Sequence, residues 1–168
     1  CIKKGKELIK WDEKYPYKEI SPTKVRSVGM ALTMQGSGIA GIDTASIEIK
    51  LNDDGNYTLL TGSTDMGTGS DTILAQMCAE VLETTMDKIV VNSADTDSSP
   101  YDPGSYASST TYITGGAVIK TCEKMRKRII EEASKALGCS IDNLEFDGKK
   151  VFSLVDEKEI SLIDIANN

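Results

Sequence analysis

The stretch TDMGTGSDTILAQ, residues 64–76, decides the fold because the spacing of apolar residues changes within it. A glycine-rich turn, Gly67-Thr68-Gly69, stands directly before a run in which apolar residues recur at helical spacing. This run predicts a core-facing helix from Ser70 to about Glu83. The first amides of such a helix have no internal partner, so the turn suits either a helix cap or a bound anion.

The sequence on either side of this stretch completes an α+β pattern. Upstream, residues 46–62 alternate apolar and polar residues about a turn at Asp54-Gly55, which predicts a β-hairpin with one buried face. Downstream, the pattern predicts a strand at 88–95, a long helix from about Thr111 to Gly138, two short strands within 144–153, and the start of a last helix near Ser161. The order β-β-α-β-α-β-β predicts a two-layer α+β fold, with a mixed β-sheet and helices packed on one face.

The N-terminal part of the chain differs in character from the rest. Residues 1 to about 28 have weak periodicity and predict an arm or short helix that lies on a neighbouring surface. Gly36, Gly38 and Gly41 then predict a flexible or ligand-facing loop. We therefore divide the chain into an N-terminal arm with its Gly-rich loop, residues 1–41, and one incomplete domain, residues 42–168. Because the chain begins with Cys1 rather than methionine, we expect a fragment or processed product of something longer.

Composition excludes several classes of function. The chain has 19 basic and 26 acidic residues and a formal net charge of −7, which argues against binding to a nucleic-acid backbone. No apolar run approaches the length of a membrane span, and no signal sequence is visible. We therefore expect a cytoplasmic protein without a nucleic-acid or membrane partner.

Histidine is absent from the whole chain, which excludes His-dependent nucleophile pairs and imidazole zinc sites on these residues. The four cysteines are widely spaced and include no C-x-x-C pair. Cys78 and Cys122 fall on the apolar sides of the predicted helices, so we expect buried thiols. Neither a disulfide framework nor a cysteine metal site is expected.

Two polar loops precede the two predicted helices. The first contains Gly67-Thr68-Gly69, and the second, residues 104–116, offers several hydroxyl donors. If both helices pack on the sheet in the same direction, both loops could face one polar ligand. The alternative is that Thr68 or Ser70 simply caps the first helix. Residue patterns alone leave three interpretations open: an enzyme segment, a phosphate- or nucleotide-binding module, and a structural or interaction domain.

The motif GSTDMGTGSDTILAQMCAEVL, followed some 30 residues later by DPGSYASSTTYITGGAVIKTCEKM, resembles the large molybdenum subunit of the xanthine dehydrogenase and aldehyde oxidase family. The upstream KVRSVGMAL and the Gly-rich loop fit as well, so the resemblance covers most of the chain in the same order. It implies part of a molybdenum hydroxylase that acts on a purine, another N-heterocycle or an aldehyde. In such enzymes a molybdenum-bound hydroxyl attacks an electron-poor carbon, and hydride passes to a sulfido ligand.

The resemblance also implies a cofactor and the residues that hold it. The cofactor is molybdopterin, in its simple or dinucleotide form, and the protein holds it through amides and hydroxyls. Ser109 is expected to point away from the site, and Met34–Gly38 falls near the family's substrate pocket. Motif by motif, the expected cofactor contacts are Met66, Gly67, Thr68, Gly69, Ala107, Ser108, Thr110 and Thr111, and the chain supplies no metal ligand.

This chain departs from the family in one residue and in its extent. The family usually has glutamine at the position of Thr68, and threonine cannot present an amide there. The family's general base is a glutamate beyond the point where this chain stops, so the resemblance implies no catalytic residue here and no hydroxylase activity for the isolated chain. It also implies other parts of the molybdenum subunit, iron–sulfur clusters and FAD on other domains or subunits, and a small-molecule substrate as partners.

Overall fold

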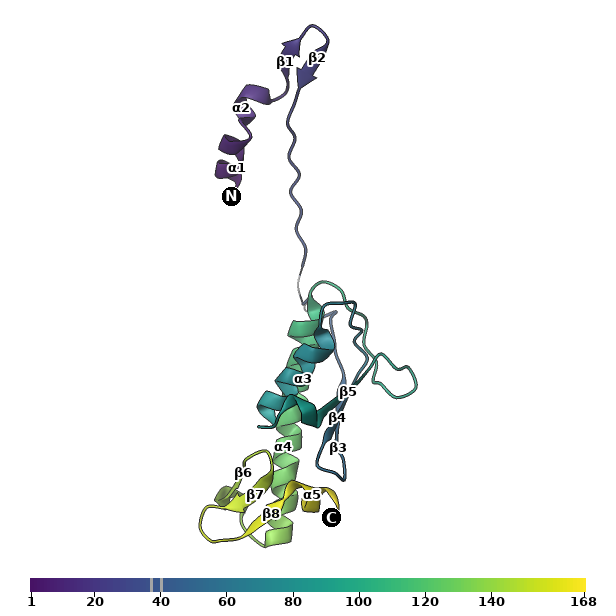
Figure 1. The fold of residues 1–168 in the computed structure, drawn as a ribbon, viewed down its shortest axis with the longest axis vertical. Helices are drawn as coiled ribbons and strands as arrows, with labels where there is room; N and C mark the ends of the chain where they lie inside the picture. The colour runs from purple at the N-terminus through teal and green to yellow at the C-terminus, as the bar shows by residue number, and fades with distance from the viewer. Residues whose placement is uncertain (37, 40) are drawn as a thin grey trace. The chain divides into compact units, whose positions relative to one another are not determined.

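The computed structural model describes residues 1–36, 38–39 and 41–168, which form two compact units, residues 1–35 and 36–168 (Figure 1). Each unit is described by itself. The functional division drawn from the sequence, at residue 41, stays a prediction. Within the described part of the chain, none of the helices has the length and apolar character that a bilayer crossing requires.

Unit 1 contains two short helices, α1 (Ile2–Leu8) and α2 (Trp11–Lys14), and a hairpin of β1 (Lys18–Ser21) and β2 (Lys24–Arg26). The sequence predicted an arm or short helix here but not the hairpin, whose apolar residues Ile20 and Val25 are both exposed. The rings of Trp11 and Tyr15 stack with their centroids 4.9 Å apart. No residue of unit 1 is buried, so this unit has no core of its own.

The centre of unit 2 is a three-stranded mixed sheet in the order β3-β4-β5. Strands β3 (Ile47–Leu51) and β4 (Tyr57–Thr61) form the predicted antiparallel hairpin. Strand β5 (Ile89–Ser93) lies parallel to β4, with Tyr57 opposite Ile89 and Thr61 opposite Ser93. Between β4 and β5 the chain forms α3 (Ser70–Val81) and a short 3-10 helix (Met86–Lys88), so β4, α3 and β5 make a parallel crossover.

The long helix α4 (Gly115–Leu137) lies beside α3 on one side of this sheet (Figure 1). The core lies between the helices and the sheet and includes Leu74, Val118, Tyr57 and Leu59. Cys78 and Cys122 are fully buried in the same core with their sulfurs 3.5 Å apart, which confirms the predicted buried thiols. The hydrogen bond with the Cys122 thiol, followed by burial, raises the pKa of Cys78, so this thiol stays protonated.

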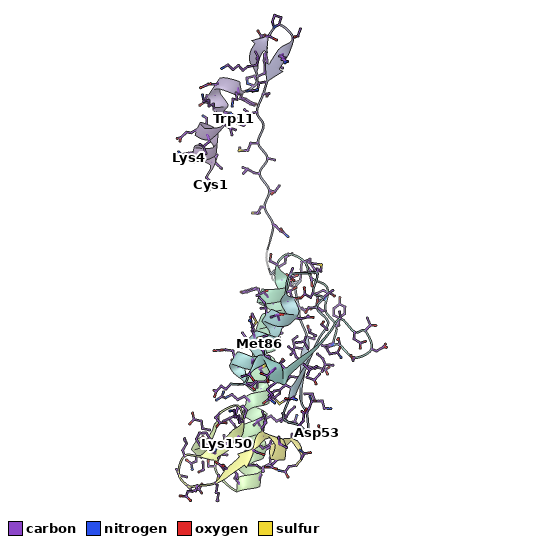
Figure 2. All side chains as sticks on the ribbon, in the orientation of Figure 1. Cys1, Lys4, Trp11, Asp53, Met86 and Lys150 are labelled. Carbon is purple, nitrogen blue, oxygen red and sulfur yellow. The ribbon has the colours of Figure 1, made fainter. Side chains whose placement is uncertain are left out.

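A second, antiparallel sheet of unit 2 has the order β6-β7-β8, with β6 (Leu144–Phe146), β7 (Lys150–Ser153) and β8 (Glu159–Ser161). A 3-10 helix (Ile141–Asn143) precedes it, and α5 (Leu162–Ala166) follows it. The turn at Asp53 and the strand that carries Lys150 both lie at the end of unit 2 away from the start of α4 (Figure 2). The α+β class is confirmed; β8 is an additional strand, and the last three strands form their own sheet.

Candidate functional site

The two polar loops leave the central sheet at the same edge. Because β4 and β5 are parallel, residues 62–69 after β4 and residues 94–109 after β5 both start from strand carboxyl ends. Each loop leads into one of the two helices of unit 2 that pack beside each other, α3 and α4 (Figure 1). In open α/β arrangements, ligands bind beside the carboxyl ends of parallel strands. We call this region, residues 62–69 and 94–114, the loop end.

Direct contacts hold the two loops together. A Cβ added at Gly62 would lie 2.3 Å from the carbonyl oxygen of Pro100, so only glycine permits this approach. The Ser105 hydroxyl donates to the carbonyl of Thr64 over 2.7 Å. At the start of α4, a Cβ at Gly115 would lie 2.7 Å from the sulfur of Met77 on α3. The loops therefore form one continuous surface.

The first turn is organised by Asp65. Its Oδ1 accepts hydrogen bonds from the amides of Gly67 (2.8 Å), Thr68 (2.9 Å) and Gly69 (3.1 Å). The expectation that these amides are free is therefore wrong, and so is the expectation that Thr68 or Ser70 caps α3, whose N-cap is Gly69 without a side-chain cap. Gly67 and Gly69 have φ of 95° and 76°, a conformation that favours glycine.

The charge of Asp65 follows from these contacts. Partial desolvation on its own would raise the pKa of the Asp65 carboxyl, but the backbone hydrogen bonds from residues 67–69 and Asp71 outweigh it and lower the pKa. The carboxylate is therefore ionised at neutral pH. It stands at the N-terminus of α3, where the helix dipole stabilises negative charge.

The same Asp-x-Gly pattern recurs in the second loop. Asp102 Oδ1 accepts the amide of Gly104 over 2.8 Å, as Asp65 does for Gly67. This repeated pattern is typical of an Asx-turn, and it is the sequence signal that could have identified both aspartates as turn organisers. Neither appeared among the predicted site residues.

The second loop holds two consecutive non-glycine residues in the left-handed region, Ala107 (φ 48°) and Ser108 (φ 56°). Such strain is uncommon outside functional sites. Among the described residues, no hydrogen bond satisfies the amides of Ala107 and Ser108. A π-helical segment, Thr110–Thr114, then leads into α4, and wide turns of this kind also recur at functional sites.

Buried hydroxyls lie beneath the loop surface. Five of the six buried polar residues recorded belong to this end of unit 2, and the sixth, Ser153, belongs to β7. Thr61 and Ser63 are hydrogen-bonded to each other over 2.9 Å, whereas the Ser70 hydroxyl has no partner among the described residues. Buried polar groups are costly unless paired, so their concentration here sets this end apart from the apolar core. The five are Thr61, Ser63, Ser70, Ser109 and Thr114.

Asp71 and Asp43 tie neighbouring segments to the loops. Asp71 Oδ2 accepts the hydroxyl of Ser93 over 2.9 Å, which joins α3 to the end of β5. Asp43 accepts the hydroxyl of Tyr106 over 2.6 Å and the amide of Ile39 over 2.6 Å. The bond to Asp43 raises the pKa of Tyr106. In the predicted Gly-rich loop, Ser37 and Ala40 lie outside the described residues.

The predicted contact residues fall into two groups by exposure. All eight reach the surface at least in part, whereas Ser109, which was expected to point away from the site, is buried. Among the described residues, no group of acidic or sulfur ligands converges on one point as a metal centre. The exposed predicted residues are Met66, Gly67, Thr68, Ser108 and Thr111, and the half-buried ones are Gly69, Ala107 and Thr110.

Comparison with known proteins identifies a family that this chain matches. A family model described as "Molybdopterin cofactor-binding domain" matches residues 4–168. The probable hypoxanthine oxidase XdhD of Escherichia coli (strain K12) is 36% identical over 137 residues, which cover 82% of this chain and 14% of that protein.

A second relative and a solved structure also match this chain. The putative xanthine dehydrogenase molybdenum-binding subunit XdhA of Escherichia coli (strain K12) is 29% identical over 148 residues, covering 86% of this chain and 20% of that protein. The structure of reconstituted CO dehydrogenase from Oligotropha carboxidovorans aligns with a TM-score of 0.68 and 25% identity, over 79% of this chain and 17% of that chain. The chain therefore spans a fifth or less of the length of these proteins.

Proposed function

This chain belongs to the molybdopterin cofactor-binding domain family of the molybdenum hydroxylases, and we propose that its loop end forms part of the wall of the cofactor site. The observation that carries the proposal is the meeting of two glycine- and hydroxyl-rich loops at the carboxyl ends of β4 and β5. The residues named from the family motifs belong to these two loops or, for Thr110 and Thr111, to the π-helical segment that follows the second.

The donor chemistry of the loops fits a polar, anionic cofactor. In the second loop, the amides of Ala107 and Ser108 have no partner among the described residues, and the side chain of Thr111 is exposed. In the first loop, a Cβ at Gly67 or Gly69 would meet nothing within 4 Å, so bare backbone faces outward there. Donors of this kind hold a large cofactor by many individually weak contacts.

We assign different tasks to the two loops. Ala107, Ser108, Thr110 and Thr111 would bind the cofactor through amides and hydroxyls. Met66, Gly67, Thr68 and Gly69 would line it through the surface of the peptide and the Thr68 hydroxyl. The hydrogen bond from the Ser109 amide to the Tyr106 carbonyl, over 2.9 Å, closes the turn that contains the strained residues 107–108, which pre-organises their donors before binding.

A bound molybdopterin cofactor supplies the redox chemistry of hydroxylation. The described residues orient it and shield one side of it from water, and we place no general base among them. The isolated chain is accordingly inactive, and the complete protein would act on a purine, another N-heterocycle or an aldehyde. Its electrons would leave through iron–sulfur clusters, and through flavin where present, on other domains or subunits.

Molybdenum and pterin content tests this proposal. The complete protein that carries this chain, purified from its own host, is expected to contain molybdenum and pterin in equal amounts. Replacing Thr68 with glutamine supplies the amide that the family usually has, so Thr68→Gln should retain more molybdenum through repeated gel filtration than the wild type does.

The matched control is Thr72→Gln, because Thr72 is also exposed but lies on α3 beyond the turn. It should leave retention unchanged. Wild-type protein that is active without molybdenum would contradict the proposed function. Equal retention by Thr68→Gln and Thr72→Gln would contradict the position given to Thr68.

A further inference from the structure

The first turn already contains an anion of its own. Three consecutive amides, those of Gly67, Thr68 and Gly69, converge on Asp65 Oδ1, and the Thr68 hydroxyl lies 3.5 Å from the same oxygen. A phosphate bound at a helix N-terminus takes up this same kind of donor set. The Asp65 carboxylate therefore stands where such a ligand would otherwise be bound.

No side-chain cation within the described part of the chain pairs with this carboxylate. None of the ion pairs between described residues includes Asp65. Its charge is balanced by the amides of the turn and by the positive end of α3. A second anion at the turn would meet both occupied donors and a like charge at close range, which opposes binding.

The second loop differs in this respect. Among the backbone amides of the described residues, Asp102 accepts that of Gly104 alone, and its Oδ2 also accepts the Thr114 hydroxyl over 3.5 Å. The amides of Ala107 and Ser108 have no partner among the described residues. The two loops therefore begin with the same Asp-x-Gly pattern but offer a ligand different donors. The first offers side chains and peptide faces, and the second offers N–H groups.

We propose that Asp65 is a positioning residue, whose carboxylate acts as a built-in anion that fixes the first turn and excludes an anionic group from the amides of residues 67–69. The proposal rests on the proposed function at one point, which is that the excluded anionic group belongs to the cofactor. The first turn would then contact the cofactor through Thr68 and through the peptide groups of Gly67 and Gly69. The conformation of the turn is fixed before the cofactor binds.

Titration with inorganic phosphate, followed by amide NMR of the 168-residue chain, tests the exclusion directly. In the wild type the amide signals of residues 67–69 should not move as phosphate is added, whereas in Asp65→Ala they should. Asp147→Ala is the matched control, because Asp147 also accepts two turn amides, at 2.9 Å each, in the distant β6–β7 turn. It should behave like the wild type. Phosphate shifts at residues 67–69 of equal size in the wild type would overturn the proposal.

Asp65→Asn separates the charge from the hydrogen bonds. The amide oxygen can still accept from the turn, so this variant should keep the fold even where Asp65→Ala does not. In the wild type, lowering the pH through the carboxyl titration should shift the amide signals of residues 67–69 together, and in Asp65→Asn this shift should vanish. An unchanged pH response in Asp65→Asn would show that Asp65 does not control the turn.

Cofactor retention in the complete protein gives the second readout. Asp65→Ala should lower molybdenum content about tenfold, the scale seen when a residue that orients a ligand is removed, and Asp65→Asn should restore much of it. Asp147→Ala should have no such effect. Full molybdenum content in Asp65→Ala would count against the proposal. Wild-type protein without molybdenum and pterin would refute the proposed function, and the phosphate titration would then still decide the role of Asp65.

Discussion

Asp65 and Asp147 play the same local structural role at opposite ends of unit 2. Each accepts backbone amides in a turn that contains a left-handed glycine, and these hydrogen bonds lower the pKa of each carboxyl against the opposing effect of desolvation. Their surroundings differ. Gly67 and Gly69 beside Asp65 face open space, whereas a Cβ at Gly148 beside Asp147 would lie 1.9 Å from the carbonyl oxygen of Glu83.

The far end, which we call the packed end, consists of residues 82–83 and 144–161. There the Arg126 guanidinium pairs with Glu83, donates to the Phe146 carbonyl over 3.2 Å and lies over the Phe146 ring. These contacts lock the β6–β7 hairpin onto the end of α3. A glycine turn serves the fold alone where a neighbouring segment fills the space beside its glycine. Where that space is open, the outer surface of the turn can contact a ligand.

The largest expected effect is on stability at the packed end. Gly148→Ala forces a Cβ into the Glu83 backbone at a left-handed φ of 84°, so it should lower the free energy of unfolding by at least about 3 kcal/mol. Gly67→Ala meets only the conformational penalty, about 1–2 kcal/mol. Urea unfolding of both variants measures the difference. Equal losses would break the comparison.

A smaller effect is expected from the buried hydroxyls of the loop end. Ser63→Ala removes the hydroxyl that is bonded to the Thr61 hydroxyl, which keeps the amide of residue 63 as a donor, and should cost about 1 kcal/mol of unfolding free energy. Ser70→Ala removes a buried hydroxyl that has no partner among the described residues, so it should cost nothing or stabilise the fold. Thermal unfolding of the two variants checks this order. A larger loss for Ser70→Ala would show that its hydroxyl is satisfied in solution.

The smallest expected effect is the pH dependence of the charged turn at the packed end. The folded-state pKa of Asp147 is lowered, so its charge stabilises the fold above the ordinary aspartate pKa of about 3.9 and ceases to do so as the pH falls through the folded-state value. Asp147→Asn should therefore be less stable than the wild type at pH 7, and this difference should shrink at pH 3. A difference that is constant across this range would mean that charge plays no part.

The sequence predicted the elements well where periodicity was strong. The hairpin at β3–β4, strand β5, and helices α3 and α4 follow from apolar spacing and from glycines with left-handed φ, such as Gly138 at the end of α4. The β1–β2 hairpin could not be predicted because Ile20 and Val25 are exposed and leave no pattern of burial. The family match then separated the three functional interpretations that residue patterns had left open.

The two loops of the candidate site were predictable from the sequence, but their hydrogen bonding was not. The two loops were named from their glycines and hydroxyls, and the parallel pairing of β4 with β5 brings them together. The Asp-x-Gly spacing predicts at most a bond from the aspartate to the amide two residues on, and it does not specify that Asp65 also accepts the amides of Thr68 and Gly69. Asp65 was therefore missed, although the Asp-x-Gly pattern was present in both loops.

The parallel pairing of β4 with β5 also bears on how the molecule is made. These strands are separated in the chain by all of α3, so their pairing is a non-local contact that forms only when the connecting segment has folded back. Both loops are completed by that same late event. A partly folded chain would thus present neither loop in its final form, so the cofactor proposed to bind here would meet either the complete surface or none at all.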